Sequence, residues 1–195
     1  MYPLFESINL KEGVIERVEL HQQRVNETFA ILFGKSHPPS LSKVLAAASL
    51  PTTGHHKIRI SYNSHETMLT VLPYQMASIT SLKIIVSDTI AYPFKYNDRS
   101  EIAALYAQRG SCDDILIIKN GLLTDTSYCN LILFDGTRWL TPRLPLLKGT
   151  FRQYLLDHQL LTEADIPVEH LSRFTKVKLI NALMGMNGPE PRFFR

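Results

Sequence analysis

The sequence contains few cysteines and no long hydrophobic run. Its 195 residues include two cysteines, Cys112 and Cys129. They lack the spacing of a metal site, so we expect two free thiols in a reducing compartment and no bound metal. No apolar stretch approaches the length of a membrane span, and the first residues, MYPLFESINLKEG, lack the basic and apolar regions of a signal peptide. These absences predict a soluble, cytoplasmic globular protein with no membrane partner.

The net charge is also small. With 21 Lys and Arg against 18 Asp and Glu, the formal net charge is +3. The basic residues are scattered and form no stripe of the kind that nucleic-acid binding needs. The sequence therefore predicts no nucleic-acid partner, whereas a local pocket for a small anion is compatible with it.

The composition supports a normal hydrophobic core. Hydrophobic residues make up 45% of the chain, which is enough for one compact domain or two small ones. No internal repeat or low-complexity tract is present. We expect a small N-terminal α+β domain at 1–80 and a C-terminal domain at 81–195, with YQMASITS at 74–81 as the linker.

Hydrophobic periodicity predicts helices and paired strands in the first 80 residues. A helix that ends at Gly34 places His21 and Arg24 on one face, because residues three apart are neighbours on a helix. Apolar and polar residues alternate on both sides of Asn63-Ser64, as in a hairpin. The expected elements are a strand at 4–10, helices at 19–34 and 40–50, and paired strands within 57–73.

The remaining residues predict a meander of strands with helices packed to one side. Asn120-Gly121 and Asp135-Gly136 are typical of tight hairpin turns, and Asp98 with Glu101 has the spacing of a helix capping box. This pattern favours an α+β fold, with the C-terminal strands in a partly closed, barrel-like sheet flanked by helices. Strands are expected at 82–88, 113–119, 122–127, 130–134, 138–142 and 175–183, and helices at 98–110, 149–160 and near 168–174.

Lys95 and Asp125 are candidate site residues. Lys95 lies between Phe94 and Tyr96 in an aromatic loop, where desolvation would lower the pKa of its amine toward that of a nucleophile able to form a Schiff base. Taken alone, an ordinary exposed loop lysine is the commoner interpretation. Asp125, in the polar segment LTDTSYCN, could hold a ring nitrogen protonated or could be a strand-edge acid facing water.

The turn KGTFR, which opens a helix, is a candidate anion site. The backbone amides of Thr150 and Phe151 lie at the helix N-terminus, and the Thr150 hydroxyl adds a donor; a simple helix cap would have the same sequence. Arg24 could bind a phosphate through a bidentate guanidinium or could be a solvated helix residue. The segment INALMG could bring backbone amides to a ligand or could only pack in the core.

Together and in this order, the motifs resemble those of the fold-type IV pyridoxal-phosphate enzymes, the class IV aminotransferase family. This family includes 4-amino-4-deoxychorismate lyase and the D-amino-acid and branched-chain aminotransferases. The lysine-to-arginine spacing and the sequence NALM resemble the lyase most. The matching residues are His21 with Arg24, Lys95 with Arg99, Gly121 with Thr124, Asp125 and Asn130, the stretch 135–142, Gly149 with Arg152, and 181–184.

The resemblance implies a homodimeric enzyme that binds pyridoxal 5′-phosphate and acts on a small amino substrate. It implies that Lys95 forms the Schiff base and moves protons, and that Asp125 takes the place of the family's glutamate beside the pyridine nitrogen. The phosphate would be received by the turn and by Arg24, and backbone near the end of the chain would close the site. The implied cofactor-binding residues are Arg24, Lys95, Asp125, Thr150, Phe151, Ala182 and Leu183.

The substrate pocket and the reaction are less defined. Arg59, in the strand KIRIS, and His55 or His56 just before it are candidates for a substrate carboxylate, whereas an arginine on a hairpin is more often exposed or paired. The N-terminal half is abbreviated relative to the family, and Asp125 is one methylene shorter than glutamate. Lyase and transaminase chemistry are the two alternatives. Beside them stand a cofactor-binding protein with little turnover and an α+β interaction domain without a cofactor.

Overall fold

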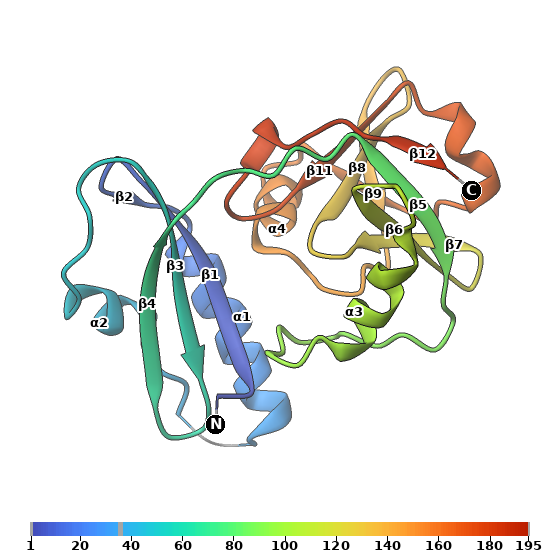
Figure 1. The fold of residues 1–195 in the computed structure, drawn as a ribbon. Helices are drawn as coiled ribbons and strands as arrows, with labels where there is room; N and C mark the ends of the chain where they lie inside the picture. The colour runs from blue at the N-terminus through green and yellow to red at the C-terminus, as the bar shows by residue number, and fades with distance from the viewer. Residues whose placement is uncertain (1, 35–36, 195) are drawn as a thin grey trace. The chain divides into compact units, whose positions relative to one another are not determined.

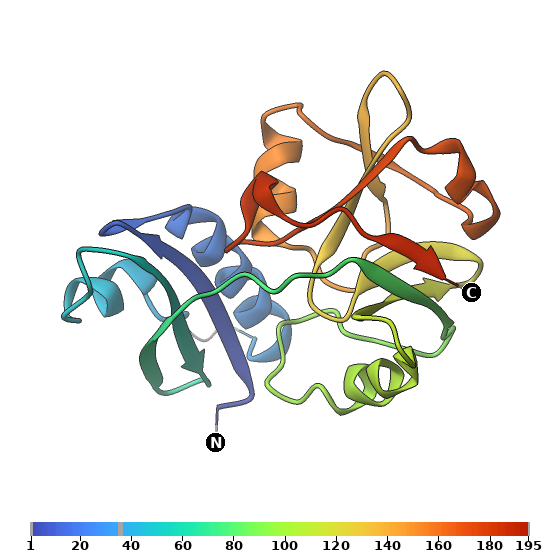
Figure 2. The same ribbon diagram turned by 45° about the horizontal axis from the view of Figure 1, so that its top comes forward.

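The computed structural model describes residues 2–34 and 37–194 of the chain (Figures 1 and 2). The chain divides into two compact units. Unit 1 comprises Met1–Gln75 together with Phe94–Asp98, and unit 2 comprises Met76–Pro93 together with Arg99–Arg195. The segment that carries Lys95 therefore belongs to unit 1, although it lies far along the chain from the rest of that unit.

Unit 1 is a four-stranded antiparallel sheet with helices against one face. The strand order is β2-β1-β3-β4, and β1 pairs with β3 along its whole length, from Leu4 opposite Tyr62 to Lys11 opposite His55. Figure 2 shows α1 lying along the sheet. The elements are β1 (Leu4–Lys11), β2 (Val14–Ile15), α1 (Val18–Leu32), α2 (Leu41–Ala46), β3 (His55–Tyr62) and β4 (Thr67–Pro73).

The core of unit 1 follows from the alternation of strand residues. Successive side chains of a strand point to opposite faces, so every second residue of β1 and β3 is buried against α1 and α2. Figure 1 labels these elements. The fully or almost fully buried residues that share this core are Leu4, Ile8, Leu10, Val25, Phe29, Leu41, Leu45, Ile58, Ile60 and Tyr62.

Unit 2 is built on a mixed eight-stranded sheet. The strand order is β10-β9-β8-β7-β6-β5-β12, and β11 pairs with β8. The elements are β5 (Ser81–Val86), α3 (Ser100–Tyr106), the 3₁₀ turn η1 (Ala107–Arg109), β6 (Asp114–Lys119), β7 (Leu122–Thr126), β8 (Asn130–Phe134), β9 (Trp139–Pro142), α4 (Thr150–Asp157), β10 (Thr162–Ala164), η2 (Val168–Arg173), β11 (Lys176–Ile180), η3 (Gly185–Asn187) and β12 (Arg192–Phe194).

The predicted meander is present as β6 to β9, whose consecutive strands pair antiparallel. Asn120 and Gly121 both have positive φ, 52° and 76°, between β6 and β7, as a tight hairpin turn requires. The α+β prediction is confirmed. Two local details differ from it. Strands β5 and β6 pair parallel with α3 between them, and α3 begins at Ser100 with Arg99 as its N-cap rather than at Asp98.

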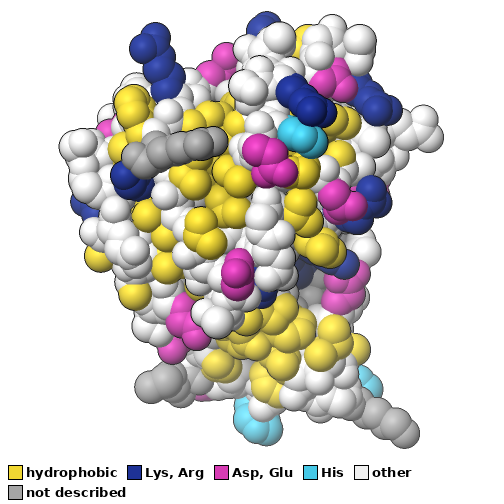
Figure 3. Space-filling model, turned by 90° about the vertical axis from the view of Figure 1, so that its right-hand side faces the viewer, with side chains coloured by type: hydrophobic (Ala, Val, Ile, Leu, Met, Phe, Trp, Pro, Cys, Tyr) yellow, Lys and Arg dark blue, Asp and Glu magenta, His cyan; other side chains and the backbone are white. Residues whose placement is uncertain are grey.

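Surface features are consistent with the composition. On the face shown in Figure 3, Lys and Arg side chains are dispersed among acidic and hydrophobic ones and do not gather in a stripe. Both cysteines carry free thiols, and that of Cys129 is buried. Among the residues that the structure describes, no helix is both long and apolar enough to cross a membrane.

Candidate functional site

The segment Phe94–Asp98 is held against the first strand of unit 1. The backbone N–H of Phe5 donates to the carbonyl oxygen of Lys95 at 3.0 Å, and the N–H of Asn97 donates to that of Pro3 at 2.8 Å. Lys95 is half-buried, and its Nζ lies 4.8 Å from the centroid of the Phe5 ring. Lys95 is thus not an exposed loop lysine. Backbone hydrogen bonds and an aromatic face define its position.

A second cation contacts the same aromatic ring. The guanidinium carbon of Arg59, on β3, lies 3.7 Å from the Phe5 centroid, and its Nη2 donates to the side-chain oxygen of Asn97. Arg59 and Lys95 are therefore both held by Phe5 and its neighbours. The other two candidates for a substrate carboxylate are His55 and His56. His55 pairs with Asn9, 2.6 Å from Nε2 to Oδ1, and His56 is the next residue of β3.

Arg24 is part of a buried charge cluster. Its Nε and Nη2 donate to the two carboxylate oxygens of Glu6 at 2.9 and 2.5 Å, and Nδ1 of His21 lies 2.6 Å from Glu6 Oε2. The Arg24 side chain is 12% exposed and that of Glu6 is 0% exposed. The interpretation of Arg24 as a solvated helix residue is wrong. The predicted common face of His21 and Arg24 is confirmed, since both contact one carboxylate.

Charge in this cluster is stabilised by pairing. Burial raises the pKa of Glu6, but Arg24 and the hydrogen bond from His21 outweigh it and hold that pKa at about 2, below its ordinary 4.5. Burial lowers the pKa of His21, against the pull of Glu6. His21 is therefore neutral near pH 7 and donates its Nδ1–H to a carboxylate that stays ionised.

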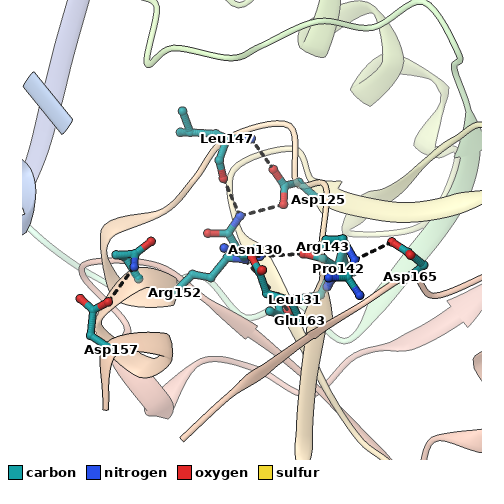
Figure 4. Close-up of polar contacts among 12 residues, drawn as sticks. Asp125, Asn130, Leu131, Pro142, Arg143, Leu147, Arg152, Asp157, Glu163 and Asp165 are labelled. Atoms are coloured by element: carbon teal, nitrogen blue, oxygen red, sulfur yellow. Dashed lines mark hydrogen bonds and ion pairs between the residues drawn. The ribbon is translucent and has the colours of Figure 1, made fainter. Parts of the chain in front are cut away.

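Asp125 lies at the centre of a hydrogen-bonded cluster in unit 2 (Figure 4). Its Oδ1 accepts from Nδ2 of Asn130 at 2.7 Å, and its Oδ2 accepts from the backbone N–H of Leu147 at 2.9 Å. The same Asn130 amide donates to the carbonyl oxygen of Leu147 at 2.9 Å. Asp125 is only 5% exposed, so its interpretation as an acid facing water is wrong.

The protonation of Asp125 is set by opposing effects. Burial raises its pKa from 3.8 to about 6, although the hydrogen bonds from Leu147 and Asn130 and the charge of Arg152 act to lower it. The carboxyl is consequently mostly ionised at pH 7. Each of its oxygens accepts one of the two bonds described above, and a carboxylate has about four lone-pair sites. Asp125 can therefore accept a hydrogen bond from a further donor.

The predicted anion turn leads into α4, which starts at Thr150, three residues after Leu147. Gly149 is the N-cap, and no acidic residue stands in the first turn of the helix. A Cβ added to Gly149 would lie 2.0 Å from Oδ1 of Asn130, so a larger residue fits there only if the Asn130 side chain moves. Thr150 and Phe151 are both buried. The first turn of the helix thus combines the positive end of the helix dipole with no acidic side chain of its own.

Arg152 fixes α4 to the strands beneath it (Figure 4). This side chain is 2% exposed, and its Nη2 donates to the carbonyl oxygen of Pro142 at 2.8 Å and to Glu163 at 2.7 Å. Its Nε lies 3.3 Å from the hydroxyl of Thr141. Arg152 therefore anchors the helix.

Ala182 and Leu183 follow β11 in a tight turn. The side-chain oxygen of Asn181 accepts from the backbone N–H of Leu183 at 2.9 Å and of Met184 at 3.0 Å. The amide of Leu183 is thus already engaged, while Ala182 and Leu183 themselves are half-buried. This turn has a fixed shape, set by Asn181.

Glu6 was missed when the residues were considered singly. It is a buried acid in the centre of a strand whose other residues on the same face are apolar. A buried carboxylate requires a partner, and this pattern alone could have indicated that an arginine or histidine faces it.

Among the described residues 2–34 and 37–194, no group of three or more His, Cys, Asp or Glu side chains is arranged to hold a metal ion.

Comparison with known proteins identifies the family. The family model for amino-transferase class IV matches residues 3–188. An uncharacterized protein of Haemophilus influenzae is 39% identical over 189 residues, covering 95% of this chain and 100% of that protein. The crystal structure of a protein of Haemophilus somnus 129PT, provisionally named 4-amino-4-deoxychorismate lyase, has a TM-score of 0.89 at 35% identity and covers 95% of this chain and 98% of that one.

A more distant curated relative is the aminodeoxychorismate lyase of Saccharomyces cerevisiae. It is 28% identical over 213 residues, which cover 91% of this chain and 56% of the yeast protein. The chain thus spans about half the length of that relative. The chain described here belongs to the class IV aminotransferase family. Its fold is that of the fold-type IV enzymes, which depend on pyridoxal 5′-phosphate.

Proposed function

We propose that this protein is an enzyme that uses pyridoxal 5′-phosphate, held covalently through Lys95, to process a small amino substrate. The observation that carries the proposal is the placement of Lys95. A half-buried amine is fastened to β1 through Phe5, in a chain matched by the class IV family model over residues 3–188. A primary amine in a defined position is what a Schiff base with an aldehyde needs.

The donor set fits this cofactor. A phosphate calls for a guanidinium and for helix N-terminal N–H donors, and Arg24 and the start of α4 at Thr150 and Phe151 are groups of these types. A protonated ring nitrogen calls for a carboxylate, and Asp125 keeps acceptor capacity. The aldehyde calls for the Lys95 amine. By the resemblance to the class IV family, we assign these residues and the backbone at Ala182 and Leu183 to one cofactor.

Each residue then has a defined task. When bound, the cofactor acts as an electron sink for the carbanion that forms when the substrate loses its α-proton. Nζ of Lys95 takes that proton and returns it. Asp125 keeps the ring nitrogen protonated, and Arg24 with the turn fixes the phosphate. Arg59, held on the Phe5 ring beside Lys95, binds a carboxylate of the substrate.

The reaction that we favour is that of a lyase of the aminodeoxychorismate type. Two of the relatives carry that name, one of them provisionally. In this reaction the substrate loses pyruvate and an aromatic amine remains, so no amino acceptor is consumed. Transamination is the alternative within the family, and there an oxo acid must accept the amino group. The family is defined by both chemistries.

A protein that binds the cofactor with little turnover is the second candidate. The observation in its favour is that the chain spans 56% of the yeast lyase. Such a protein would retain the Lys95 adduct and the cofactor-binding residues but would not release product. The proposed localisation is the cytoplasm, and the proposed assembly is a homodimer, as is usual in the family.

One assay separates these functions. Purified protein with pyridoxal 5′-phosphate is given 4-amino-4-deoxychorismate, with and without an added oxo acid, and both pyruvate and the amino acid formed from the oxo acid are measured. We expect pyruvate without the oxo acid, no product from Lys95→Ala, and unchanged product from Lys11→Ala, an exposed lysine of β1. Activity that requires the oxo acid would identify a transaminase. A cofactor adduct without any product, over a panel of amino acids, would identify the binding protein.

A further inference from the structure

Glu6 takes no part in the chemistry described above, yet its buried carboxylate accepts hydrogen bonds from two side chains of α1. Its side chain is 0% exposed, and leaving a carboxylate out of water is costly unless it is paired and hydrogen-bonded. Three donors approach it: Nε and Nη2 of Arg24 at 2.9 and 2.5 Å, and Nδ1 of His21 at 2.6 Å. An apolar residue of similar size would avoid the cost of burying this charge. The presence of a glutamate here therefore suggests a functional role.

The geometry of the pair suggests that use. A guanidinium has five N–H donors in a rigid planar fork. Glu6 engages the Nε edge of Arg24 with both oxygens, which fixes the plane of the guanidinium and the direction in which the rest of it faces. The Arg24 side chain is 12% exposed, so it is largely but not fully buried.

His21 restrains Glu6 in turn. Its ring is buried, with a side chain 1% exposed, and its Nδ1 contacts Oε2, the same oxygen that accepts from Nη2 of Arg24. A neutral imidazole donor adds a hydrogen bond without adding charge. Glu6 is thus fixed from the helix at two points, His21 and Arg24, one turn apart on α1.

We propose that Glu6 is a positioning residue for phosphate recognition, which holds the Arg24 guanidinium in the orientation that receives the phosphate of the cofactor. This inference rests on the proposed function. Two effects oppose each other here: the negative charge of Glu6 repels a phosphate, whereas the fixed fork removes the freedom that Arg24 would lose on binding it. The proposal states that orientation outweighs repulsion.

The two effects predict opposite results for Glu6→Gln. The amide keeps the shape but carries no charge and offers a single acceptor oxygen to the fork. The readout is the ratio of the apparent Kd values of pyridoxal and pyridoxal 5′-phosphate, each measured from the visible absorbance of the Lys95 adduct. Because the two ligands differ only in the phosphate, a general loss of structure lowers both affinities and leaves the ratio unchanged.

We expect Glu6→Gln to reduce this ratio about tenfold or more, the size of one lost charge-assisted hydrogen bond, with little change for pyridoxal. In an Arg24→Ala background the same change should leave the ratio unaltered, because Glu6 acts through Arg24. Glu16→Gln is the matched control, since Glu16 pairs with Arg17 at 2.5 Å elsewhere in the unit. It should leave the ratio unaltered.

Glu6→Asp keeps the folding charge balance if Glu6→Gln proves too unstable to purify. Its carboxylate is one methylene shorter and withdraws the fork, so the ratio should again fall. A ratio that is unchanged or raised in either variant would overturn the proposal. If the parent protein forms no Lys95 adduct with either ligand, the proposed function fails instead. An adduct with a phosphate preference that survives Glu6→Gln and Glu6→Asp removes only the role of Glu6.

Discussion

The backbone N–H of Phe5 donates to the carbonyl oxygen of Lys95, and the Phe5 ring lies beneath the lysine amine, 4.8 Å from Nζ to the centroid. One residue of the first strand therefore sets both the backbone and the side-chain position of a lysine 90 positions later in the sequence. The same ring supports Arg59 at 3.7 Å. The amine that we propose as the nucleophile and the cation that we propose for the substrate carboxylate thus both contact a single aromatic residue.

Asp125→Asn should change how stability depends on pH. The pKa of Asp125 is raised from 3.8 to about 6 in the folded protein, so between these values the folded state retains a proton that the unfolded state has lost. Asp125 therefore contributes stability that is fully present below about pH 4 and lost by about pH 7, amounting to about 3 kcal/mol. The amide of the variant does not titrate, so the stability of the variant lacks this component.

The measurement is urea unfolding of both proteins without cofactor, followed by circular dichroism from about pH 4 to about pH 7. The difference in unfolding free energy, parent minus variant, should fall as the pH rises. Glu6 acts in the other direction: its pKa is lowered to about 2, so its stabilisation is lost only as the pH falls below 4.5. It is common to both proteins and cancels. A constant difference across the range would contradict the prediction.

Gly149→Ala should destabilise unit 2 through Asn130. Gly149 has φ −72°, which alanine adopts without strain, but the new Cβ would lie 2.0 Å from Asn130 Oδ1. Asn130 must then rotate and lose its bonds to Asp125 and Leu147, at a cost of about 2 kcal/mol. In an Asn130→Ala background the added cost should nearly vanish. Equal costs in both backgrounds, by urea unfolding, would rule out this mechanism.

Arg152→Ala and Arg143→Ala form a matched pair. Both arginines pair with an acid in the same unit, but the Arg152 side chain is 2% exposed and that of Arg143 is 52% exposed. Loss of Arg152 removes hydrogen bonds to Pro142 and Glu163 from a buried site and should cost about 3 kcal/mol. Loss of Arg143 should cost less than about 1 kcal/mol. Similar losses in thermal unfolding would contradict the anchoring role of Arg152.

Local signals in the sequence predicted most elements of the fold. Periodicity located the strands and helices within a few residues, and Asn120-Gly121 marked a hairpin that the structure confirms through two positive φ angles. The parallel pairing of β5 with β6 was not predicted, because no local residue pattern specifies which distant strand is a neighbour. The return of 94–98 to unit 1 depends on backbone hydrogen bonds to β1, which also leave no mark in the sequence.

In the candidate site, too, the sequence indicated residues but not their distant neighbours. Residue types, and their order along the chain as in the class IV family, indicated Lys95, Arg24 and Asp125 as candidates. Their hydrogen-bond partners could not be predicted, because they lie far away in the sequence. Glu6 lies 18 positions from Arg24, and Leu147 lies 22 positions from Asp125. These partners fix orientation and pKa, so the sequence indicated the candidate groups but not how they are held.

The central claim is that Lys95 holds the cofactor covalently. The most direct test is the visible spectrum of the protein with pyridoxal 5′-phosphate before and after borohydride, followed by peptide mapping of the reduced adduct by mass spectrometry. The account predicts one reducible adduct, located on Lys95, absent in Lys95→Ala and retained in Lys11→Ala. An adduct spread over several surface lysines, or one that persists in Lys95→Ala, would contradict it.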